Sequence, residues 1–93
     1  MNNPVERPAH YTFGKIEVLE AITDWQLNFS RGSAVKYLVR AGRKDPATEI
    51  QDLKKAAYFI AREIERLEKR QAAAEANEIT VFEALHNLAK WGL

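Results

Sequence analysis

The chain has 93 residues, of which 46% are apolar and 29% charged, with 14 Lys and Arg against 13 Asp and Glu. A chain of this length forms at most one small domain, and its net charge of +1 excludes the strongly basic character of bulk nucleic-acid binders. It has no cysteine and two histidines, which excludes disulfides, thiolate metal sites and multi-histidine metal sites within one chain. No apolar run approaches a membrane span and the N-terminus is polar, so we expect an intracellular protein.

The first quarter of the chain predicts an arm followed by a helix. Residues 1–14 contain Pro4 and Pro8, lack periodicity and end in glycine, which predicts an extended arm. Ile16, Leu19 and Ile22 then recur at helical spacing and predict a helix over 15–25.

A second helix is predicted over 30–41. Ser30 is its expected N-cap, with Gly32 and Ser33 as competing starts. Gly42 suits the left-handed position that ends many helices. Asp45 and Pro46 then favour a new helix start, with Asp as N-cap and Pro at the first helical position.

The remaining chain predicts a long helix over 46–75 and a last helix over 80–91. A heptad-like apolar seam with steps of three and four residues lies on one face of the long helix: Ile50, Leu53, Ala57, Ile60, Ile64 and Leu67. Thr80 and Glu83 fit a capping box for the last helix. Residues 1–93 are thus expected to be one all-α domain: a bundle of about four helices with one long central helix. Because the long helix exceeds the width of so small a domain, we also expect a homo-oligomer.

Cationic and aromatic residues suggest a site for a phosphate-bearing ligand. Arginine and lysine bind phosphate oxygens, and tyrosine can stack on a base. The alternative is a solvated helical hairpin whose cations form ion pairs with Glu49 and Asp52. There is no glycine-rich phosphate loop and no visible nucleophile, so no catalytic residue is predicted. The candidate ligand-binding residues are His10, Tyr11, Lys36, Tyr37, Arg40, Arg43 and Lys44.

Two acidic pairs suggest a different chemistry. Their spacing is similar to the signature of MazG-like all-α nucleoside-triphosphate pyrophosphohydrolases, which use Mg²⁺. The resemblance implies a metal site at Glu17, Glu20, Glu49 and Asp52. Solvated carboxylates on helix surfaces are the alternative, and no cofactor is expected unless the protein is an enzyme.

Four separated blocks resemble a family of small bacteriophage proteins. They are PAHY (8–11), IEVLE (16–20), GSAVKYLVRAGRK (32–44) and EIQDLKKA (49–56). The family is known as a domain of unknown function and often carries the label "nucleotide kinase". The chain departs from the usual residues at Glu20 (usually Asp), Ser33 (usually Asn) and Gln51 (usually acidic), which weakens any transfer of catalysis.

The resemblance implies a phage protein in the cytoplasm of an infected bacterium, with a nucleotide or nucleotide-derived ligand. We therefore expect a phage accessory protein that binds a phosphorylated nucleotide and sequesters it as an immune signal, a counter-defence function without catalysis. The alternatives are a nucleotide kinase, an Mg²⁺-dependent pyrophosphohydrolase, and a helical adaptor that binds a host protein.

Overall fold

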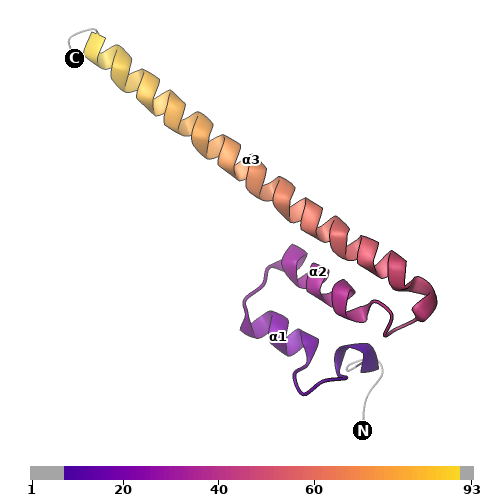
Figure 1. Cartoon of the computed structure of the whole chain (residues 1–93). Helices are drawn as coiled ribbons and strands as arrows, with labels where there is room; N and C mark the ends of the chain where they lie inside the picture. Colours follow the sequence, from indigo (N-terminus) through magenta and orange to yellow (C-terminus); the bar gives the residue numbers. More distant parts are fainter. Residues whose placement is uncertain (1–7, 91–93) are drawn as a thin grey trace. The chain divides into compact units, whose positions relative to one another are not determined.

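Five helical segments make up most of residues 8–90, the part of the chain described in this computed structural model (Figure 1). In chain order they are the 3₁₀ turn η1 (Ala9–Tyr11), α1 (Val18–Asp24), α2 (Phe29–Arg40), the 3₁₀ turn η2 (Pro46–Thr48) and α3 (Glu49–Lys90). No strand occurs in this range, which confirms the all-α class. The chain divides into two compact units, residues 1–63 and residues 64–93, which are described separately.

The predicted starts of the first two helices are wrong by one to three residues. Helix α1 begins at Val18 rather than residue 15, because Glu17 has extended backbone with ψ 144°. Helix α2 begins at Phe29, and its N-cap is Asn28 rather than Ser30. The Asn28 side chain accepts a hydrogen bond of 2.9 Å from the backbone N–H of Arg31, which satisfies one of the free donors of the first turn.

Gly32 is part of α2 and sets how closely α1 approaches it. The glycine is buried, and a Cβ at this position would lie 2.9 Å from Cγ2 of Ile22 on α1. Val18 on α1 and Ala34 on α2 are buried as well, each 8% exposed. The close contact between the two helices therefore depends on the absence of a side chain at Gly32, which leaves room for Ile22.

The connection from α2 to α3 follows the predicted turn chemistry. Gly42 has φ +77°, the left-handed conformation expected after a helix. The Asp45 side chain accepts a 2.9 Å hydrogen bond from the backbone N–H of Ala47, and Pro46 follows it at the first helical position. One refinement is that Pro46 opens the 3₁₀ turn η2, and α3 itself begins at Glu49.

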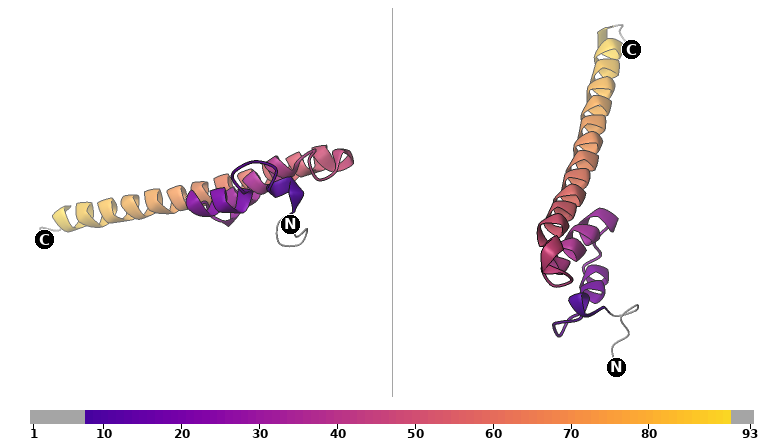
Figure 2. Two further views of the ribbon diagram at one scale, coloured as in Figure 1. Left: turned by 90° about the horizontal axis from the view of Figure 1, so that it is seen from below. Right: turned by 90° about the vertical axis from the view of Figure 1, so that its right-hand side faces the viewer.

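In residues 8–63, α2 lies between α1 and the first turns of α3 (Figures 1 and 2). Helices α2 and α3 run antiparallel, because Arg40 at the end of α2 meets Asp52 while Asn28 at its start meets Glu63. The buried residues of α3 are Asp52, Ala56 and Glu63, which share one face at four- and seven-residue steps.

The heptad-like apolar seam is not the face of α3 that is buried in this unit. Ile50, Leu53 and Ile60 are 70%, 43% and 52% exposed. The physical reason is that α2 presents Asn28, Arg31 and Arg40 to α3. These polar side chains select the carboxylate-bearing face of α3 instead of its apolar seam, because buried polar groups need partners.

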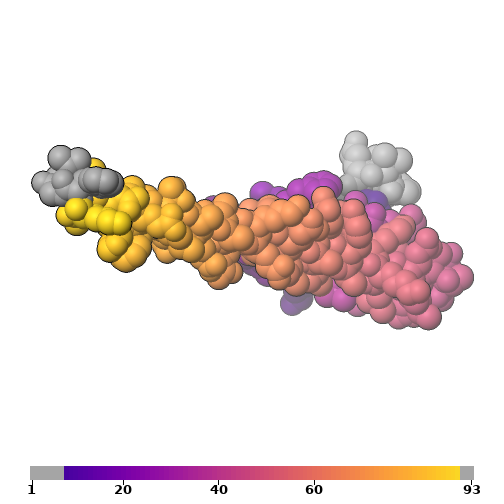
Figure 3. All heavy atoms as spheres, turned by 90° about the horizontal axis from the view of Figure 1, so that it is seen from above, coloured from indigo at the N-terminus to yellow at the C-terminus, as the bar shows by residue number. Residues whose placement is uncertain are grey.

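Residues 64–90 continue as α-helix without the break predicted between 75 and 80. Thr80 does not cap a new helix: its hydroxyl donates a 2.9 Å hydrogen bond to the carbonyl of Ala76 one turn earlier, a bond typical of a helix interior. The predicted end at Trp91 lies outside the described residues. Figure 3 shows one face of this helix (orange to yellow), with its side chains in the open. None of the helices within residues 8–90 is long and apolar enough to cross a membrane.

Candidate ligand-binding site

Five of the seven predicted ligand-binding residues come together where η1 meets the second half of α2. The ammonium nitrogen of Lys36 lies 5.9 Å from the ring centroids of both Tyr11 and Tyr37. The guanidinium carbon of Arg40 lies 5.2 Å from the Tyr37 ring. His10 contacts Tyr11 edge to face, with centroids 4.1 Å apart. We name this set, together with Arg43 and Lys44, the cationic cluster.

The other two residues join the cluster from the turn after α2. The guanidinium carbon of Arg43 lies 3.6 Å from the centroid of Phe13, which follows η1. Lys44 is near enough to His10 to lower its pKa by charge repulsion. The arm and the end of α2 are therefore held together by cation–π contacts, which contribute about 0.5–2 kcal/mol each.

Helix α3 contributes two residues that the sequence analysis did not assign to the site. The ammonium nitrogen of Lys55 lies 5.4 Å from the Tyr37 ring centroid. The Phe59 ring stacks on the Tyr37 ring, with centroids 5.8 Å apart and an angle of 9° between the ring planes. Lys55 and Phe59 follow Asp52 by three and seven residues, so all three lie on one face of α3. This spacing is the feature of the sequence from which their place in the site could have been predicted.

A buried ion pair lies beneath the cluster. Nε of Arg40 is 3.3 Å from Oδ1 of Asp52, and the Asp52 side chain is 1% exposed. Neither carboxylate oxygen of Asp52 makes a hydrogen bond within the described part of the chain. Such unsatisfied buried groups are few in native proteins, and they mark this position as chemically unusual.

The cluster changes the pKa of its own members. The pKa of His10 is lowered, first by burial and then by the positive charges of Lys44 and Arg40, so this imidazole is biased toward its neutral form. Burial raises the pKa of the Tyr11 hydroxyl, which keeps it protonated. Burial alone would lower the pKa of Arg40, but Tyr11 and the charge of Asp52 outweigh it and raise this pKa.

The four carboxylates of the suggested metal site do not come together. Among residues 8–90, no three His, Asp or Glu side chains are grouped as metal ligands. Asp52 faces Arg40, whereas the Glu49 carboxyl lies against Gly42, 2.9 Å from where a Cβ would stand. The alternative stated for the cations, ion pairs with Glu49 and Asp52, is therefore met at Asp52, which pairs with Arg40.

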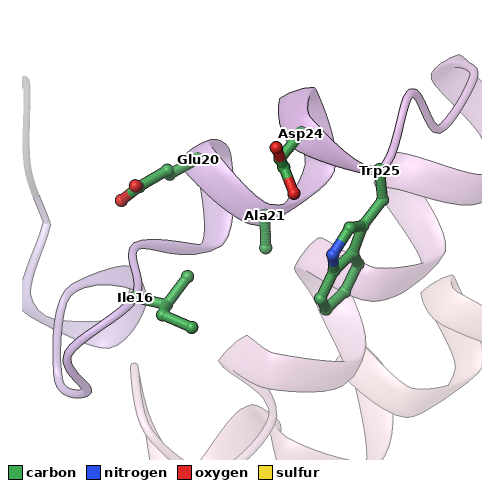
Figure 4. A pocket seen from close by; sticks show the side chains of 5 residues that line it. All are labelled: Ile16, Glu20, Ala21, Asp24 and Trp25. Atoms are coloured by element: carbon green, nitrogen blue, oxygen red, sulfur yellow. The ribbon is translucent and has the colours of Figure 1, made fainter.

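A pocket of about 230 Å³ lies along α1, and Glu20 is part of it (Figure 4). Asp24 and Trp25 line it together with Ile16 and Ala21, and Glu20 points away from the Trp25 ring. Two carboxylates repel a phosphate, so this pocket does not suit the ligand expected at the cationic cluster.

The cationic cluster can therefore do two things chemically. Lys36, Arg43 and Lys44 have exposed side chains and can contact phosphate oxygens. Half-buried Tyr11 and Tyr37 provide ring faces on which a planar group can stack. Arg40 is paired with Asp52 and connects the cluster to α3.

The comparisons with known proteins bear on the same part of the chain. No curated protein and no solved structure matches the chain. One family model, described as a protein of unknown function (DUF3310), matches residues 5–61. This range is more than half of the chain and contains the whole cationic cluster with Asp52. The chain therefore belongs to the DUF3310 family.

Proposed function

We propose that this protein is a phage accessory protein that binds a phosphorylated nucleotide at the cationic cluster, in the cytoplasm of an infected bacterium. The observation that carries the proposal is the convergence of Lys36 and Lys55, from two helices, on the ring of Tyr37. A nucleotide joins an anionic phosphate to a planar base, and it needs both kinds of contact at one place.

The proposed ligand is held without conversion. Phosphoryl transfer and hydrolysis of a triphosphate both need groups that hold Mg²⁺ or orient the attacking oxygen. Asp52, a carboxylate next to the cations, is buried and paired with Arg40. We therefore favour sequestration of a nucleotide immune signal, a counter-defence function, by a homo-oligomer of this chain.

A second candidate function is a nucleotide kinase, and the environment of Asp52 is the observation that favours it. Its two oxygens have no hydrogen-bond donor within residues 8–90, and it lies next to the cluster through Arg40. If ligand binding displaced Arg40, this carboxylate could hold Mg²⁺ near the phosphates. We place the pyrophosphohydrolase alternative last, because no group of three His, Asp or Glu side chains is placed as metal ligands within residues 8–90.

Calorimetry with a panel of mono-, tri- and cyclic nucleotides tests binding. Lys55→Ala should weaken the affinity about tenfold, which corresponds to about 1.4 kcal/mol. Lys54→Ala is the matched control, because it removes the same charge one position away on α3, about 100° around the helix. If no nucleotide binds, or if both variants lose the same affinity, the proposal is wrong.

The fate of the ligand separates sequestration from catalysis. After incubation with a bound nucleotide and heat denaturation, sequestration predicts that the ligand is recovered unchanged. After incubation with ATP, Mg²⁺ and a mononucleotide, a kinase would yield ADP and the corresponding diphosphate. Chromatography of the supernatant distinguishes these outcomes directly.

A further inference from the structure

Residues 64–90 carry a heptad repeat that the cationic cluster does not explain. The positions that correspond to d of a coiled coil are all apolar: Leu67, Ala74, Val81 and Leu88. The a positions are apolar at both ends of the repeat and polar at the two positions between them: Ile64, Gln71, Glu78 and Leu85. The sequence of residues 50–60 has the same phase, with Ile50 and Ala57 at a and Leu53 and Ile60 at d.

Most of the seam of residues 64–90 is exposed in the described chain, and Leu67 is partly buried. Ile64, Val81 and Leu85 are 50%, 51% and 61% exposed, and Leu88 is 47% exposed. No residue from 64 to 90 is buried. A lone helix of this kind is marginal in water, because most helix stability comes from packing an apolar face. Some partner should therefore cover this seam.

We propose that the partner is a second copy of this chain, and that residues 64–88 of the two copies form a parallel, in-register two-stranded coiled coil. In this register Arg70, at position g, lies opposite Glu75 of the second copy, at position e. The symmetry gives two such attractive pairs. Gln71 at an a position meets its own copy, where two amides can hydrogen-bond across the seam and fix the register.

The charges disfavour the opposite orientation. In an antiparallel pair with Gln71 opposite Ala74, the e positions of the two chains face one another. Glu68 of one copy would then face Glu75 of the other, and this like-charge contact would occur twice. The parallel register has one repulsive seam layer, at Glu78, which would meet its own copy. That layer gives the proposal its sharpest test.

The first experiment measures the dissociation constant of the full-length dimer by analytical ultracentrifugation. Glu78→Ile should lower this constant at least tenfold, because it replaces the repulsive seam layer with an apolar one. Glu83→Ile is the matched control, because position f points away from the seam, and it should leave the constant unchanged. A monomer at about 100 μM, or equal effects of the two substitutions, overturns the proposal.

The second experiment tests orientation, using the absence of native cysteine. Gln71→Cys should form an intermolecular disulfide upon air oxidation, because a positions face their own copies in a parallel dimer. Ala76→Cys, at position f, should not. Cross-linking of both or of neither variant contradicts the parallel register. Nucleotide binding by a monomeric protein would overturn this proposal and the expected homo-oligomer, but it would leave the proposed nucleotide binding at the cationic cluster intact.

Discussion

Helix α3 buries two carboxylates on one face, and their surroundings differ sharply. Glu63 accepts hydrogen bonds from Nδ2 of Asn28 at 2.5 Å and from Nε of Arg31 at 2.8 Å. Asp52 lies 3.3 Å from Arg40, and neither of its oxygens has a hydrogen-bond donor within the described residues. The two groups are 7% and 0% exposed, so burial alone does not distinguish them.

The difference indicates that Glu63 has a structural role, whereas Asp52 is a candidate for a functional role. Glu63 joins the start of α2 to α3, and its hydrogen bonds offset the cost of burying its charge. Asp52 forms an ion pair with Arg40, a member of the cationic cluster. A buried group without hydrogen bonds is unusual, and such groups gather at functional sites. The comparison fits the proposal that the Asp52 region binds the ligand, and it indicates that the Glu63 region stabilises the fold.

The largest expected effect is that of Asp52→Ala. It leaves the Arg40 guanidinium, whose side chain is 18% exposed, without its counter-charge. Removing one partner of a buried ion pair costs about 3–5 kcal/mol. Urea denaturation followed by circular dichroism should show a loss of this size in the free energy of unfolding.

The double variant Arg40→Leu/Asp52→Leu is the control for this prediction. It removes both charges and keeps apolar volume, so it should be more stable than Asp52→Ala. If the double variant lost as much stability as the two single losses combined, Arg40 and Asp52 would not act as a pair.

A smaller effect is expected at Asn28, in the Glu63 region. Asn28→Ala removes both the N-cap of α2 and the hydrogen bond to Glu63, and should cost about 2–3 kcal/mol. Asn28→Ser keeps a capping oxygen but is too short to reach Glu63, so it should lose about half as much. Equal losses for the two variants would show that the cap contributes little and that the bond to Glu63 dominates.

Local signals were enough to predict the helical class and the turn before α3. Gly42 and the Asp45-Pro46 pair act within a few residues of themselves, so their conformations follow from sequence. The buried face of α3 could not be predicted in this way. Periodicity favoured the apolar seam, but the polar residues of α2 selected the face with Asp52 and Glu63, and that choice depends on tertiary contacts.

The candidate site was predictable where its members share one short segment. Lys36, Tyr37 and Arg40 fall within five positions of α2, and cations near a helix end are visible in sequence. Lys55 and Phe59 were missed, because only the antiparallel pairing of α2 with α3 brings them to Tyr37. The acidic pairs misled for the same reason, since equal spacing on two helices does not place four carboxylates together.

The smallest expected effect concerns pH and sharpens the same comparison, because His10 belongs to the Asp52 region. Its folded-state pKa is below the ordinary value of 6.5, through burial and the charges of Lys44 and Arg40. Between these two pKa values the unfolded chain binds more protons, so the contribution of neutral His10 to stability is present above pH 6.5 and is lost as the pH falls. The stability difference between the wild type and His10→Asn should therefore shrink from pH 7.5 to pH 5, measured by urea denaturation. His86→Asn is the control for the loss of a histidine outside the cluster. A wild-type advantage that grows toward pH 5 would mean that His10 is held in its charged form, and that the cations do not act on it as the structure indicates.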